Sequence, residues 1–161
     1  MKAEFMDSFA NYGDAIFRFC LVKVSNKELA EDMTQEVFTR YWQYLRDGKT
    51  MTNTRSLLYT IANNMAKDWY KKKKSVSLDD RLDAGLEPSA NDTDAQIHAE
   101  YNELLDVIEG MDEQDKTVLV MRHVEGLPPK DIAEILDEKA SVISVRIFRA
   151  EKRLKEKMHH G

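Results

Sequence analysis

Apolar side chains recur at intervals of three and four residues along most of the chain, which is the spacing of one face of an α-helix. Before residue 75 this pattern predicts three helices, over about residues 3–24, 27–45 and 54–74. Ser25-Asn26 supplies a cap for the second helix, and Gly48 permits that helix to stop. No run of alternating β-branched residues is present, so the chain is predicted to be all-α.

The same spacing returns after residue 97 and predicts four more helices. Asp112 and Ser141 are placed to cap the second and the fourth of these helices. The inward side of the third helix is predicted to hold Ile132, Ala133 and Leu136. The inward side of the fourth is predicted to hold Ile143, Ile147, Ala150 and Leu154. The four helices are expected over about residues 98–109, 113–124 and 129–136 and from about residue 141 onward.

Residues 126–153 have the pattern of two short helices joined by a tight turn, with arginines on the second helix. This is the pattern of a helix-turn-helix, which places its second helix in the major groove of DNA. Between residues 146 and 157, basic residues outnumber acidic ones six to two. The alternative is an amphipathic bundle whose basic end is only solvated. The outer face and sides of the last helix, where DNA contacts are expected, hold Ser144, Val145, Arg146, Phe148, Arg149, Lys152 and Arg153.

Residues 75–97 break the helical periodicity and combine glycine, proline, serine and acidic residues, which is the composition of a linker. Their six carboxylates and one arginine account for the formal net charge of −5 of the whole chain. We therefore predict two small helical domains, residues 1–74 with three helices and residues 98–161 with four. A flexible acidic linker joins them.

The predicted third helix divides into an apolar side and a polar side that suits nucleic acid. Amides can bond base edges, lysines neutralise phosphates, and aromatic rings stack on exposed bases. A lysine-rich helix end favoured by the helix dipole is the alternative. The polar side is expected to hold Ser56, Thr60, Asn63, Lys67, Tyr70, Lys71 and Lys74, with Asn64 and Asp68 on its flank.

Several classes of function are excluded by what the sequence lacks. The four histidines form no metal-ligand spacing, and no nucleophile motif or phosphate-binding glycine loop occurs, so no catalysis, cofactor or metal is expected. Cys20, the one cysteine, excludes an internal disulfide. No apolar run approaches the roughly 20 residues that span a bilayer, and the start lacks the apolar core of a secretory signal. We expect a cytoplasmic protein without direct membrane insertion.

Three segments in register resemble bacterial RNA polymerase sigma factors of the extracytoplasmic-function group. Residues 31–42, EDMTQEVFTRYW, are similar to the ED-x-x-QE-x-F-x-R-x-W signature of sigma region 2. Residues 58–68, LYTIANNMAKD, resemble the LYRIARN-x-A-x-D segment of the same region. Residues 125–133 and 146–150 resemble the helix-turn-helix of sigma region 4.

The resemblance implies a transcription initiation factor that binds core RNA polymerase and directs it to promoter DNA. It also implies that an anti-sigma factor inhibits the protein by binding to it. The polar face of the second helix, taken alone, is typical of a solvated surface. In the family this helix grips a coiled coil of the largest polymerase subunit. Core contact would then fall to Glu31, Asp32, Gln35, Glu36 and Arg40.

The resemblance also assigns the DNA elements to the two domains. The last helix would read the −35 element as duplex, through the seven residues named above. The loop over residues 46–55 and the third helix would open and read the −10 element, with a flipped base held near Asn64. The residues implied in the −10 contact are Arg55, Asn63, Asn64, Lys67, Asp68 and Lys71.

The chain departs from the family pattern in three respects. Ser144 and Val145 stand where the recognition helix usually begins with a basic residue, Asp137 stands where the tight turn usually has glycine, and Leu57 replaces a common tryptophan. The competing function is a helix-turn-helix regulator that binds palindromic duplex DNA as a dimer, without contacting polymerase. Neither the 31–42 motif nor the acidic linker has a use in that alternative.

Overall fold

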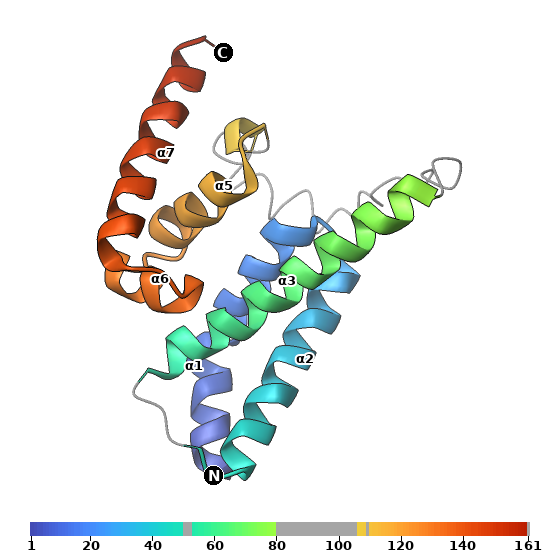
Figure 1. Ribbon diagram of the computed structural model, residues 1–161. Helices are drawn as coiled ribbons and strands as arrows, with labels where there is room; N and C mark the ends of the chain where they lie inside the picture. Colours follow the sequence, from blue (N-terminus) through green and yellow to red (C-terminus); the bar gives the residue numbers. More distant parts are fainter. Residues whose placement is uncertain (50–52, 80–105, 109, 161) are drawn as a thin grey trace. The chain divides into compact units, whose positions relative to one another are not determined.

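The computed structural model describes residues 1–49, 53–79, 106–108 and 110–160, and every regular element among them is helical (Figure 1). The chain divides into two compact units, Met1–Asp94 and Ala95–Gly161. The prediction of an all-α fold is confirmed. Most of the predicted linker lies outside the described residues. No helix in the described part of the chain is long and apolar enough to cross a membrane.

The first unit is built from three helices, α1 (Lys2–Val24), α2 (Lys27–Arg46) and α3 (Thr54–Asp79), each packed against the other two (Figure 1). Ser25 ends α1 in the left-handed conformation, with φ of 54°. Of the two residues predicted to supply the cap of α2, Asn26 is the one that does so, since its Oδ1 accepts the Leu29 N–H at 2.9 Å. The third helix runs five residues beyond its predicted end at residue 74.

The core between these helices is rich in aromatic rings that meet edge to face. Phe19 on α1 and Tyr59 on α3 have ring centroids 5.5 Å apart at 88°. The hydroxyls of Ser8 and Tyr41 share a buried hydrogen bond of 3.0 Å that joins α1 to α2. Each of these two buried hydroxyl oxygens therefore has a hydrogen-bond partner in the core.

In the second unit, the helix predicted after Asp112 divides into α5 (Glu113–Leu119) and a π-helix, η1 (Val120–Val124). The wider turn is visible in a hydrogen bond of 3.0 Å from the Glu125 N–H to the Val120 carbonyl, five residues back. A π-turn rotates less per residue than an α-turn, so the adjacent Val120 and Met121 both lie in the core. The sequence predicted one continuous α-helix, because apolar spacing does not register this local change.

Two helices complete the described part of this unit, the short α6 (Pro129–Leu136) and the long α7 (Ala140–His160), which pack on each other. Asp137 links them in the left-handed conformation, with φ of 54° and ψ of 51°. The predicted cap at Ser141 is wrong, because α7 begins one residue earlier and Ser141 lies inside its first turn. Ile135 is buried and Leu136 is half-buried, although Leu136 was predicted as the inward position.

Asp112 precedes α5 at the predicted cap position, but its side chain makes no capping hydrogen bond. Of the helix predicted over residues 98–109, only residues 106–108 are described, and they are helical. The core of this unit joins α5, η1, α6 and α7 through fully buried aliphatic side chains. They include Val118, Leu119, Leu127, Ile132 and Ile143.

Candidate nucleic-acid interface

The last helix, α7, has a buried side and an opposite side that is open to solvent. Ile143, Ile147 and Ala150 lie in the core as predicted, whereas Leu154 is half-buried. Six of the seven predicted DNA contacts are exposed, and Arg146 alone is half-buried. The exposed six are Ser144, Val145, Phe148, Arg149, Lys152 and Arg153.

The arginines of α7 differ in what they contact within the unit. Arg146 Nη2 lies 3.8 Å from the Glu138 carboxylate in the turn before α7. Arg153 Nη1 donates to Asp115 Oδ2 of α5 at 2.5 Å. Arg149 makes no ion pair or hydrogen bond to another side chain in the described part of the chain. Arg149 therefore has its whole donor fork available for an external acceptor.

An open groove of about 620 Å³ runs between the first turn of α5 and the exposed side of α7. Asp112, Gln114 and Asp115 form its α5 wall. The α7 wall alternates small or apolar side chains with guanidinium groups, so the groove combines nonpolar surface with hydrogen-bond donors. That wall is made of Ser141, Val142, Val145, Arg146, Arg149 and Arg153.

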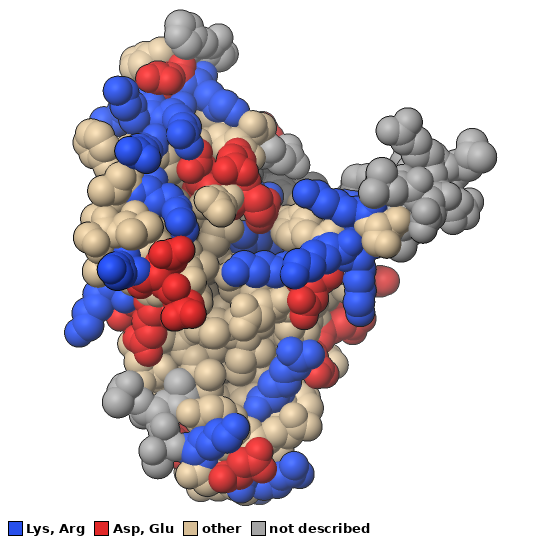
Figure 2. Space-filling view, viewed as in Figure 1, with Lys and Arg blue, Asp and Glu red and all other residues tan. Residues whose placement is uncertain are grey.

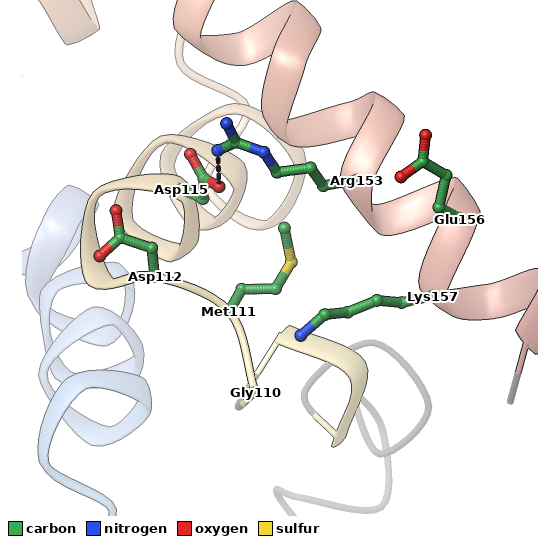
Figure 3. Close-up of a pocket in the computed structure, with 7 residues that line it drawn as sticks. All are labelled: Gly110, Met111, Asp112, Asp115, Arg153, Glu156 and Lys157. Carbon is green, nitrogen blue, oxygen red and sulfur yellow. Dashed lines mark hydrogen bonds and ion pairs between the residues drawn. The ribbon is translucent and has the colours of Figure 1, made fainter.

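A second pocket, of about 550 Å³, lies beside this groove toward the end of α7 (Figure 3). The Arg153–Asp115 ion pair forms one side of it, and Lys157 reaches toward the backbone of Gly110. The pocket is lined by three carboxylates and two cationic side chains, so its net charge does not favour an anion. No group of three or more metal-ligating side chains occurs among the described residues.

Basic side chains gather along α7 and along the second half of α3 (Figure 2). Lys71, Lys72, Lys73 and Lys74 are consecutive and exposed, and the Lys73 ammonium lies 4.8 Å from the centroid of the Trp69 ring. Like charges this close repel one another, so the end of α3 favours a polyanion nearby.

The predicted polar side of α3 is only partly exposed in the structure. Asn64, Lys67, Asp68 and Lys71 are exposed, and Arg55 is half-buried with its guanidinium 5.9 Å from the centroid of Tyr59. These five lie where a nucleic acid has access to them.

Ser56 and Asn63 are corrections to the prediction, because both are buried, at 1% and 2% exposure. Ser56 Oγ and Asn63 Nδ2 have no hydrogen-bond partner in the described part of the structure. The buried side of α3 is rotated by about a quarter turn from the predicted one, toward these two residues. Tyr59 and Ala66 lie on the same side of α3 as Ser56 and Asn63, at helical spacing, and are buried too. These two residues were the signal in the sequence that this side of the helix is buried.

The polar face of α2 is exposed at all five predicted positions. Among the described residues, Glu31, Asp32 and Gln35 make no ion pair or side-chain hydrogen bond, and Arg40 Nε donates to Glu36 Oε1 at 3.2 Å, one turn apart. This i,i+4 pair is on the surface, where it contributes a few tenths of a kcal/mol at most. The face is therefore solvated and free of strong internal constraints.

One residue of the second unit that sequence reasoning missed is Asp115. It is buried and pairs with Arg153, which lies 38 residues away. Spacing within a helix cannot show a partner at that separation. The apolar positions around it did place α5 in the core, but they gave no sign that a carboxylate would be enclosed there.

Each of the two units matches a known protein family. The Sigma-70 region 2 family model matches residues 9–76, and the Sigma-70, region 4 model matches residues 101–154. The chain is 27% identical to the ECF RNA polymerase sigma factor SigW of Bacillus subtilis, over 98% of this chain and 92% of that protein. It is 26% identical to the ECF sigma factor SigM of the same organism, over 93% of this chain and 92% of that protein.

The fold is that of solved sigma factors. The structure of CnrH in complex with the cytosolic domain of CnrY covers 99% of this chain and 90% of its own, at a TM-score of 0.75 and 17% identity. RpoE in complex with NepR from Bartonella quintana covers 97% of both chains, at a TM-score of 0.70 and 17% identity. With both sigma regions matched in order, the chain belongs to the sigma-70 family of RNA polymerase sigma factors, in its extracytoplasmic-function group.

Proposed function

We propose that this sigma factor directs core RNA polymerase to promoters by dividing the work among three exposed surfaces. The α2 face binds polymerase, the α3 face handles the −10 element, and the α7 face reads the −35 element as duplex. The observation that carries the proposal is the outer side of α7. It presents Arg149, whose guanidinium has no side-chain partner among the described residues, beside the exposed Phe148 on a helix whose other side is packed into the core.

Contacts to the −35 element fall into two chemical kinds. Arg149 and Phe148 are positioned for base edges, whereas Lys152 lies farther along the helix and suits a phosphate. Arg146 and Arg153 already hold carboxylates of their own unit. In this proposal they orient the reading surface more than they bind DNA, and Ser144 and Val145 complete its first part.

At the −10 element, the exposed amide of Asn64 is proposed to hold an unpaired base. Lys67 and Lys71 are proposed to contact the phosphates of the DNA backbone. Arg55 and Asp68 flank this group. The burial of Asn63 removes its amide from the accessible surface, so Asn63 supports the helix and does not touch the strand in this proposal.

Polymerase binding is proposed for the α2 face formed by Glu31, Asp32, Gln35, Glu36 and Arg40. Four of the five carry acidic or amide groups, so the complementary surface is a basic one. Because these side chains make few contacts within the described part of the chain, their replacement is expected to change polymerase binding without unfolding the unit.

The test is reconstitution with core RNA polymerase and transcription from a promoter selected for this factor. The chain should support initiation, Gln35→Ala with Glu36→Ala should reduce association with core, and Asp14→Asn on the exposed side of α1 serves as the matched control. If the double variant binds core as the wild type does, the α2 assignment is wrong. If the wild-type chain binds palindromic duplex alone and never initiates, the regulator alternative replaces the whole proposal.

Two properties follow from this role. The chain works as a binding factor and not as an enzyme, and it acts in the cytoplasm, where polymerase and chromosome meet. The solved proteins of the same fold are complexes with NepR and with the cytosolic domain of CnrY, the first of which is an anti-sigma factor. We infer that an anti-sigma factor also controls this chain, by covering the surfaces named above.

A further inference from the structure

The centre of the α7 reading surface is apolar. Val145 is 48% exposed and Phe148 is 68% exposed, and the two lie three residues apart on the side opposite Ile143 and Ile147. Serine, arginine and lysine surround them, and they are the most exposed large nonpolar side chains of the helix before Met158. Neither side chain can donate or accept a hydrogen bond.

We propose that Val145 and Phe148 form a binding site for thymine methyl groups, so that the −35 element is selected partly by apolar contact. This inference rests on the proposed function of α7. In the major groove, the 5-methyl group of thymine is the one apolar feature that distinguishes a base pair, and the other edges present donors and acceptors. An apolar centre on a recognition helix therefore favours thymine and gains nothing from guanine or cytosine edges.

The charge around the apolar centre identifies DNA as the occupant. Arg149 and Lys152 flank Phe148 and are exposed, and neither has an ion pair in the described part of the chain. Guanidinium and ammonium groups around a nonpolar strip complement phosphates around methyl groups. An apolar protein partner alone would leave these cations without acceptors.

The spacing also limits where the methyl groups stand. Along the axis of α7, Val145 lies about 4.5 Å from Phe148 and about 6 Å from Arg149, and Phe148 and Arg149 are adjacent. Successive base pairs of duplex DNA rise by about 3.4 Å. The thymine contacts and a guanine read by Arg149 therefore fall on adjacent or next-adjacent base pairs.

The experiment begins with holoenzyme reconstituted from the full chain and core RNA polymerase. Promoter duplexes with a randomised −35 region are selected for binding, and each thymine of the selected element is then replaced singly by deoxyuridine. This change keeps the base pair and removes one methyl group. Binding is expected to fall about three- to fourfold at each contacted thymine, the effect of one buried methyl-sized group.

Two variants connect the effect to the site. Val145→Ala with Phe148→Ala should bind thymine and deoxyuridine duplexes equally, and alanine favours the helix, so the fold is retained. Met158→Ala, an exposed apolar residue on the same helix at 60% exposure, should discriminate as the wild type does. Replacing the selected guanine with 7-deazaguanine should weaken wild-type binding and leave Arg149→Ala unaffected.

Three results overturn the inference. If deoxyuridine changes the binding of wild-type holoenzyme at no selected position, the methyl site does not exist. The proposed function still stands in that case if the holoenzyme initiates normally. Loss of discrimination in Met158→Ala would place the site elsewhere. Self-association of the chain that Phe148→Ala abolishes, with thymine discrimination unchanged, would assign the apolar centre to a second copy. Failure of the wild-type chain to initiate at all counts against the proposed function instead.

Discussion

The Arg153 guanidinium on α7 lies 2.5 Å from the Asp115 carboxylate on α5 (Figure 3). The Arg153 side chain is 57% exposed, whereas that of Asp115 is 7% exposed. The hydrogen bond and the charge of Asp115 raise the pKa of Arg153 further above its already high value, so the guanidinium stays charged at any working pH. The pair joins α5 to the middle of α7 and holds the recognition helix in place.

Replacing Arg153 should therefore destabilise the protein more than replacing Asp115. Arg153→Gln leaves a buried carboxylate without its guanidinium and is expected to lower the melting temperature by several degrees. Asp115→Asn keeps an acceptor oxygen for Arg153 and should cost less. Thermal unfolding followed by circular dichroism measures both, with Lys152→Gln as the exposed control. If Arg153→Gln leaves the melting temperature unchanged but flattens the salt dependence of DNA binding, Arg153 is a phosphate ligand.

Arg149 and Lys152 should separate base readout from phosphate contact. Arg149→Ala is expected to cost about 1–3 kcal/mol of promoter binding and to relax the preference at one base pair. Arg149→Lys should not restore it, since an ammonium lacks the bidentate fork. Lys152→Ala should weaken all sequences alike and reduce the slope of log K against log salt by about 1. Holoenzyme binding over a salt series distinguishes the two, and equal slopes for both variants would contradict the assignment.

Asn63 and Asn64 are neighbours with opposite environments, which makes them a matched pair. Asn64→Ala should reduce promoter opening, seen as weaker permanganate reactivity of unpaired thymines near −10. Asn63→Ala should leave opening nearly intact, because the Asn63 side chain is buried with 2% exposure. Opening that depends on Asn63 and not on Asn64 would show that the DNA-bound chain repositions α3.

Asp137 occupies the left-handed conformation in the turn between α6 and α7. Asp137→Gly removes the side-chain clash of that conformation and is expected to stabilise the chain by up to about 1 kcal/mol. Asp137→Val should destabilise it, because branching at Cβ makes positive φ costly. Gly126, with φ of 69° and no atom within 4 Å of an added Cβ, is the converse control, since Gly126→Ala is strained by its backbone alone. Denaturant unfolding gives the three free energies, and a destabilised Asp137→Gly would contradict this account.

The capping residue Asn26 gives a local test of the first unit. Asn26→Ala removes the acceptor for the Leu29 N–H and is expected to cost about 1 kcal/mol of unfolding free energy. Asn11→Ala, at an exposed position within α1, should be neutral or slightly stabilising, because alanine is the better helix former. A loss of similar size in both variants would mean that the cap contributes nothing specific.

Local features were predictable because their causes are local. The cap at Asn26 and the buried spacing of Ile143, Ile147 and Ala150 each depend on residues within a few positions of one another. The same reasoning failed on α3, where polarity alone placed Ser56 and Asn63 on the surface. Their burial depends on how the helix is rotated against its neighbours, and a polar residue at the edge of an apolar stripe does not determine that rotation.

The sequence by itself determined the helices, the turn at Asp137, the acidic segment and the family, since periodicity, glycine and proline positions and three motifs in register are all properties of the linear chain. The tertiary structure alone decided which arginines of α7 remain available. Arg146 and Arg153 are held by Glu138 and Asp115, and Arg149 is left for an external acceptor. The reason is physical: a charge is neutralised by what lies within about 4 Å of it in space, and a partner 38 residues away has no trace in helical spacing.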